Sequence, residues 1–135
     1  MTVVGQLRSQ GARWFGGSIT ELTINTGTTP TRAVHPEEAA IYVFKITAGA
    51  ANLKLRMPYD VRNYTTGVFL RDIYVDAAST RSVELERFDG SVLFGGSAVT
   101  IAPGQSAIVF LRTVAAALGT WFATVRTIGG RAVHT

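Results

Sequence analysis

The segment over residues 87–128 constrains the fold of this chain more than any other. It contains short bursts of β-branched and aromatic residues, and each burst ends at a glycine or a turn-forming pair. The turn signals are Asp89-Gly90, Gly95-Gly96, Pro103-Gly104 and Gly119. Consecutive short strands joined by tight turns give this pattern. The segment therefore predicts an all-β architecture, in which these glycines serve turns and do not form a phosphate-binding loop.

The remainder of the chain continues the same pattern. We expect strands over residues 19–25, 39–47, 51–57, 68–76, 82–88, 91–94, 98–101, 107–113 and 120–128. Residues 39–47 are almost wholly apolar, which is typical of a central strand covered on both faces. Eight or nine short antiparallel strands are too many for one flat sheet. We therefore predict a single β-sandwich or jelly-roll-like domain over residues 19–135.

Residues 1–18 show no steady period, and they carry Arg8, Arg13 and the adjacent pair Trp14 and Phe15. Chain termini are often frayed, but a frayed tail seldom carries two large aromatic residues side by side. We therefore expect an extended N-terminal arm whose Trp14 and Phe15 pack on a neighbouring subunit. A frayed tail is the alternative.

The charge composition favours an interface protein. Charged residues make up 16% of the chain, against about 25% in typical soluble domains. The net charge of +4 comes from eleven arginines and two lysines on the basic side, and arginine is enriched at interfaces where lysine is depleted. The basic residues are scattered along the chain, which does not favour nucleic-acid binding.

The absence of cysteine excludes a disulfide scaffold and thiol chemistry. No apolar run reaches the roughly 18 residues of a transmembrane helix, so we expect no membrane association. The first residues lack the layout of a signal peptide, and we expect the chain to fold in the cytoplasm.

Few residues offer catalytic chemistry. His35 lies near Glu37 and Glu38, but metal ligands converge from several elements, so we interpret this run as a solvated loop. Glu84 and Glu86 share one face of a predicted strand. A solvated, salt-bridged face explains them better than the carboxylate pair of a glycosidase. We expect no catalytic residue, no metal site and no cofactor.

One predicted strand face combines basic and aromatic residues. Residues 51–57 alternate, so Lys54 and Arg56 point away from the apolar side. Basic side chains interleaved with aromatic rings suit a glycan, single-stranded nucleic acid or an acidic protein surface. An ordinary hydrated sheet face is the alternative. The candidate face comprises Lys54, Arg56, Tyr59, Arg62 and Tyr64.

The stretch VLFGGSAVTIAPGQSAIVFLRT, followed after a gap by GTWFATV, resembles the small β-structured proteins of tailed-phage virions. Head decoration (cement) proteins and tail-fibre domains of that group often close with a Gly-rich turn, a T-I-x-P-G-x-S-A strand pair and a final Gly-Thr-Trp strand. The matching positions fall within residues 92–125, about a quarter of the chain. The chain has no collagen-like or low-complexity stalk of a fibre, which favours the head over the tail.

The resemblance implies a non-enzymatic capsid decoration subunit on the surface of a phage head, made in the host cytoplasm. Its partners would be the major capsid protein or other virion proteins. It would act as a homo-oligomer, with a trimer favoured because shells offer threefold positions. Arg8 and Arg13 of the arm, together with Arg32, would meet acidic capsid surface, and salt would weaken that contact.

Two other functions stay open beside the decoration subunit. The chain is alternatively a tail, baseplate or fibre component, or a carbohydrate- or receptor-binding module that stacks its ligand on Trp121, Tyr59 or Tyr64. The position of Trp121 separates these hypotheses. We expect Trp121 in the core, whereas a glycan platform requires a ring that is open to solvent.

Overall fold

The computed structural model describes residues 19–35, 38–47, 49, 51–59, 69–94, 97–112 and 119–128. These residues form nine strands and no helix. The strands are β1 (Ile19–Ile24), β2 (Thr31–Ala33), β3 (Ile41–Ile46), β4 (Leu53–Arg56), β5 (Phe69–Val75), β6 (Val83–Glu86), β7 (Val99–Ile101), β8 (Gln105–Arg112) and β9 (Thr120–Thr127). The prediction of an all-β chain is confirmed.

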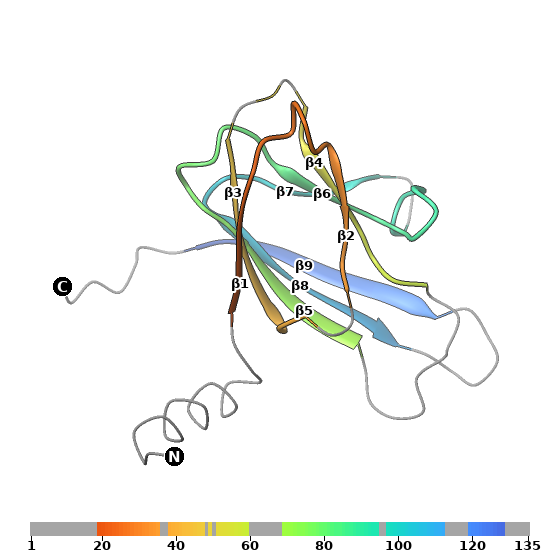
Figure 1. Cartoon of the computed structure of the whole chain (residues 1–135). Coiled ribbons are helices and arrows are strands. Elements are labelled where there is room, and N and C mark those ends of the chain that lie inside the picture. Colours follow the sequence, from red (N-terminus) through yellow and green to blue (C-terminus); the bar gives the residue numbers. More distant parts are fainter. Residues whose placement is uncertain are drawn as a thin grey trace, which may run out of the picture.

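The nine strands form two mixed sheets, which lie as two layers in Figure 1. Sheet A has five strands in the order β1-β3-β5-β8-β9, and sheet B has four in the order β2-β4-β6-β7. Within the described residues no helix is long and apolar enough to cross a membrane.

The first six strands alternate between the two sheets. β1, β3 and β5 lie parallel in sheet A, while β2, β4 and β6 lie parallel in sheet B. A parallel neighbour cannot be reached through a tight hairpin, so the chain must cross over before it returns. Here the crossover is a strand of the opposite sheet. The register follows from this route: Ile19 lies beside Ile41, and Ile41 beside Asp72.

The prediction of antiparallel strands is wrong for four strand pairs, which are parallel, and correct for three. Antiparallel pairing joins β5 to β8, β6 to β7 and β8 to β9. Alternation along a strand indicates which of its faces is buried, and it is the same whether the neighbouring strand is parallel or antiparallel. The direction depends on the connection, which alternation does not reveal. Each antiparallel pair contains at least one strand from the turn-rich segment over residues 87–128.

Most of the predicted strands are present with shifted ends, and two predictions differ. β2 was not expected, because three residues around Arg32 give no periodic signal. Residues 91–94 do not form a strand, and Val92 makes only an isolated bridge to Glu86.

The core lies between the two sheets. Tyr42, Phe44 and Ile46 of β3 are fully buried, as are Leu53 and Leu55 of β4. The rings of Tyr42 and Phe44 stack with their centroids 5.6 Å apart. The other fully buried side chains come from both sheets and include Met57, Ile73, Val75, Val83, Leu85, Ile101, Ala107, Val109 and Leu111. Trp121 is also buried, with 4% of its surface exposed, which confirms its expected place in the core.

The predicted turn at Pro103-Gly104 links β7 to β8. The Gln105 N–H donates to the Ala102 carbonyl over 2.9 Å, and Gly104 has a φ of 82°. A type II turn requires a positive φ at its third residue and favours proline at its second. The sequence signal is confirmed, and it reverses the chain from sheet B into sheet A.

Candidate assembly surface

The outer face of sheet B carries a ladder of opposite charges. Lys54 Nζ lies 2.7 Å from a Glu84 oxygen, and Arg56 Nε lies 3.2 Å from Glu86 Oε1. Hydrogen bonds from Lys54 and Asn52 lower the pKa of Glu84, while the bond to Glu84 raises the pKa of Lys54. The salt-bridged interpretation of Glu84 and Glu86 is confirmed. Each basic side chain of β4 is thus matched by a carboxylate of β6.

Of the two tyrosines of the predicted basic face, only Tyr59 belongs to the described residues. Tyr59 is 47% exposed and meets Phe88 edge to face, with ring centroids 4.7 Å apart. The Arg87 guanidinium lies 5.6 Å from the centre of the Phe88 ring. Arg62 and Tyr64 lie outside the described residues.

Arg32 forms an internal cluster with Glu38 and Tyr42. Its guanidinium makes a two-pronged contact with the Glu38 carboxylate, which also accepts a hydrogen bond from the Tyr42 hydroxyl. Burial acts to raise the pKa of Glu38, but the hydrogen bonds from Arg32 and Tyr42 outweigh it and lower the pKa to about 2. The Glu38 carboxylate therefore already binds two partners within its own chain, Arg32 and Tyr42. Binding of an acidic partner by Arg32 stays a prediction.

The metal-binding alternative at His35 finds no support in this part of the chain. The His35 backbone N–H donates to Glu38 Oε1 over 3.2 Å, and Glu37 lies outside the described residues. Across the described ranges no group of three or more His, Asp or Glu side chains is placed to hold a metal ion. The predicted arm, with Arg8, Arg13, Trp14 and Phe15, also lies outside them.

The outer face of sheet A is the surface that sequence analysis missed. We define it by the side chains of its five strands that point away from sheet B, together with Ile128 directly after β9. Its large exposed apolar members are each 36–53% exposed: Ile19, Leu70, Ile108, Phe122 and Ile128. Half-buried members fill the space between them: Ile41, Val43, Tyr74 and Phe110. The rings of Phe110 and Phe122 stack with their centroids 4.8 Å apart.

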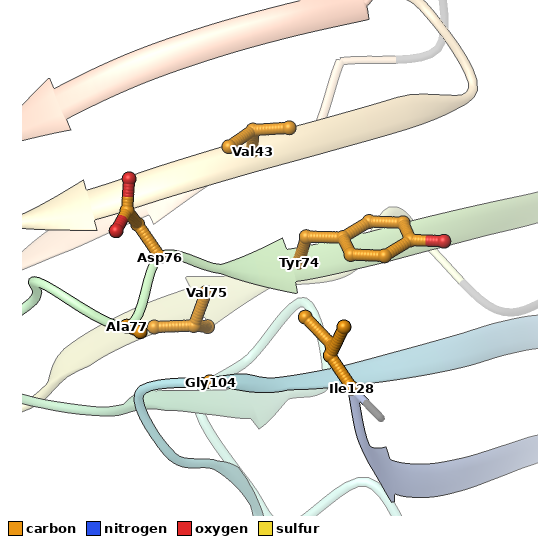
Figure 2. Close-up of a pocket in the computed structure, with 7 residues that line it drawn as sticks. All are labelled: Val43, Tyr74, Val75, Asp76, Ala77, Gly104 and Ile128. Carbon is orange, nitrogen blue, oxygen red and sulfur yellow. The ribbon is translucent and has the colours of Figure 1, made fainter. Parts of the chain in front are cut away.

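A shallow depression lies at one end of this face (Figure 2). Its volume is about 350 Å³, and its lining is mostly apolar. Val43 comes from β3, Tyr74 from β5, and Ile128 reaches toward them from the end of β9. Gly104, in the turn directly before β8, also lines the depression.

Charged side chains stand mainly at the margins of the outer face of sheet A. Glu21 lies on the edge strand β1 and Arg126 on the opposite edge strand β9. Both belong to one row across the sheet, because Glu21 pairs with Val43, Val43 with Tyr74, Tyr74 with Ser106 and Ser106 with Arg126. Arg126 also lies 3.7 Å from Asp72 on the central strand.

Comparison with known proteins gives no family. No protein-family model, curated protein or solved structure matches the chain. The function must therefore be argued from the residues of the chain itself.

One sequence signal could have pointed to the outer face of sheet A. Residues 39–47 are almost wholly apolar and were expected to be covered on both faces. In the structure one face of β3 packs in the core, whereas Ile41 and Val43 on the other face are only half-buried. The apolar run of β8 behaves alike, with Ile108 exposed opposite the buried Ala107 and Val109. Both strands thus carry apolar residues on a face that is open to solvent in this chain.

Proposed function

We propose that this chain is a non-enzymatic structural protein that acts by packing the outer face of sheet A against another protein. The observation that carries the proposal is the contrast between the two sheets. The outer face of sheet B is ion-paired within the chain, while the outer face of sheet A presents five large apolar side chains to solvent. Contiguous apolar patches of this kind mark interaction surfaces.

The outward side chains of the two sheets support the same conclusion. Ile41 and Val43 of β3 and Ile108 of β8 lie on the outer face of sheet A, whereas the outer face of sheet B carries the ion-paired Lys54, Arg56, Glu84 and Glu86. Covering the open face would remove apolar surface from water, which contributes about 25 cal/mol per Å². A protein repeated many times in an assembly needs only modest affinity at each contact, because linked sites raise the effective concentration.

Within this class we propose a capsid decoration subunit on the outside of a phage head. The resemblance of residues 92–125 to tailed-phage virion proteins supports the choice, and two sheets with a shared core are compatible with the β-sandwich domain that we propose for this role. In this proposal residues 1–18 act as an arm that contacts the shell. Arg8, Arg13 and Arg32 meet its acidic surface in this proposal, with Arg32 also paired with Glu38 of its own chain.

The test is co-sedimentation of the purified protein with heads of the phage that encodes it. We expect saturable binding that weakens as salt rises, together with a higher temperature of head disruption. Binding to isolated tails and not to heads would move the protein to the tail or baseplate. Failure to bind either particle at low salt would contradict a virion role.

One observation favours a second candidate, a carbohydrate-binding module. Tyr59 and Phe88 are both exposed and lie edge to face beside Arg87, and sugars stack on such rings. Trp121 is too buried to serve as a platform. Glycan-array binding that disappears in Tyr59→Ala would support this candidate, and an array without signal would exclude it.

A further inference from the structure

We propose that two copies of this chain pack face to face through the outer face of sheet A. The two-fold axis that relates them lies between the two copies and runs parallel to β5, directly over this strand. The inference rests on the proposed function, and it names the partner of that same surface. Its argument comes from three properties of the face: its size, its rows of side chains and the placement of its charges.

The face is large enough for a specific contact. Strands lie about 4.8 Å apart and rise about 3.3 Å per residue, so a five-stranded sheet of this length measures about 20 by 20 Å. Packing two such faces buries on the order of 1,000 Å² in total, which is near the lower bound for specific interfaces. Sheets that pack in this way keep their strands within about 30° of each other and lie about 10 Å apart.

The strand order makes the face self-complementary about its centre. β5 is the middle strand, with β3 and β1 on one side and β8 and β9 on the other. A two-fold axis along β5 therefore places β3 of one copy over β8 of the second copy, and β1 over β9. Because the axis is parallel to the strands, each row of side chains in one copy faces the same row in the other copy. Ile41 and Ile108 belong to one row, so each Ile41 meets the Ile108 of the other copy.

The charges complete the match. Glu21 and Arg126 occupy the two ends of one row. The same axis places each Glu21 opposite the Arg126 of the other copy, and this happens twice because the interface is isologous. The two Asp72 side chains approach each other near the axis, and each is accompanied at 3.7 Å by the Arg126 of its own chain, which offsets their repulsion.

This arrangement explains why the face is open in a single chain. Apolar side chains on both sides of the ion-paired Asp72, with opposite charges at the two edges of the sheet, suit a second copy of this face better than an unrelated flat surface. It also implies an even-numbered oligomer in place of the trimer that the resemblance favours.

The test uses charge reversal and mixing. Glu21→Arg places like charges opposite each other twice in its own dimer, and so does Arg126→Glu. We expect each variant alone to raise the dimer Kd about tenfold or more. In an equimolar mixture, the arginine introduced in the first variant meets the glutamate introduced in the second. The native Arg126 of the first variant likewise meets the native Glu21 of the second. The mixture is therefore expected to dimerise more tightly than either variant alone, as measured by sedimentation equilibrium, although one Asp72 of the mixed dimer has lost its Arg126 neighbour.

A second pair of variants tests the apolar centre. Ile108→Lys introduces a charge where Ile41 of the other copy would pack, and we expect it to raise the dimer Kd about a hundredfold. Val92→Lys is the matched control, because Val92 is exposed but lies next to sheet B. Circular dichroism melts establish that each variant is folded.

Several results would overturn the inference. These are a wild-type chain that stays monomeric at all concentrations, a trimer, an oligomer that neither reversal weakens, and single variants that weaken without rescue on mixing. Failure here is distinct from failure of the proposed function. A monomer that coats phage heads removes the dimer alone, whereas a dimer that ignores heads and tails removes the virion role alone.

Discussion

At Gly49 the backbone adopts a φ of 111°, which residues with a side chain rarely adopt. A Cβ at this position would overlap the Thr26 hydroxyl and lie 2.8 Å from the Gly27 nitrogen. Thr26 is buried and its hydroxyl donates to the Ala51 carbonyl over 2.8 Å. Gly49→Ala should therefore cost about 2 to 4 kcal/mol of unfolding free energy, from backbone strain and the displaced hydroxyl together.

Gly104→Ala is the control for this prediction. Its φ is 82°, but a Cβ there meets nothing nearer than the Ala77 Cβ at 3.8 Å. Strain alone should cost about 1 kcal/mol. Urea unfolding of both variants checks the difference, and equal losses would show that the contact with Thr26 is unimportant.

Glu38 should make stability depend on pH in the acid range. Its pKa is lowered from 4.5 to about 2 in the folded chain, since the hydrogen bonds from Arg32 and Tyr42 outweigh the effect of burial. A carboxyl with a depressed folded pKa contributes stability above its unfolded pKa, and this contribution is lost as pH falls from 4.5 toward 2. Solvent screens the cluster in part, so we expect about 1 to 2 kcal/mol.

The measurement is the unfolding free energy at about pH 6 and about pH 2.5, on either side of the unfolded carboxyl pKa, for the wild type and for Glu38→Gln. The wild type should lose more stability than the variant over this range, because the variant lacks the titrating group. Losses of equal size would show that Glu38 gains nothing from its partners.

At the scale of elements, two adjacent residues of β9 point to opposite sides of sheet A, Trp121 into the core and Phe122 to the outer face. Trp121 is 4% exposed and lies edge to face with Phe69, with ring centroids 5.8 Å apart. Phe122 points to the other side and is 38% exposed. Trp121→Ala should cost about 3 to 5 kcal/mol, while Phe122→Ala should cost about 1 kcal/mol or less. Thermal or urea unfolding checks both, and a small loss at Trp121 would place its ring outside the core.

The elements also show what alternation along a sequence can and cannot predict. The inward side chains of β4 and β6 were assigned correctly, because one buried face gives a period of two residues. The turn at Gly104 was found because its φ demands glycine. The parallel pairing was not found, since it depends on crossovers between sheets that leave no local signal.

The candidate site was harder to predict than the strands. Lys54 and Arg56 gave a clear basic signal, yet their partners Glu84 and Glu86 lie on a strand far along the chain, and only the fold brings them together. For the outer face of sheet A, the side of the sheet on which each residue lies was the part that could not be predicted. Its apolar residues were recognised as strand residues, but Ile108 could be assigned to the open side only once the sheet order was known.

At the scale of the whole molecule, the account depends on one claim, that the outer face of sheet A is covered in the working protein. On the outer face of sheet B, Lys54 and Arg56 form ion pairs with Glu84 and Glu86 of the same chain. The apolar core is buried between the two sheets. Among the described residues, the outer face of sheet A is therefore the apolar surface that our proposal assigns to association.

The most direct measurement exploits the absence of cysteine from the chain. Single thiols introduced by Leu70→Cys and Val92→Cys start from equal exposure, because each native side chain is 44% exposed. Leu70 lies on the outer face of sheet A, while Val92 lies beside β6. The rate of maleimide labelling is measured at low and at high protein concentration. The account predicts that labelling of the Leu70→Cys variant slows at high concentration while that of the Val92→Cys variant does not. Equal labelling rates for both variants at every concentration would contradict self-association through this face, and labelling of the Leu70→Cys variant that phage heads do not slow either would contradict the claim that the face is covered.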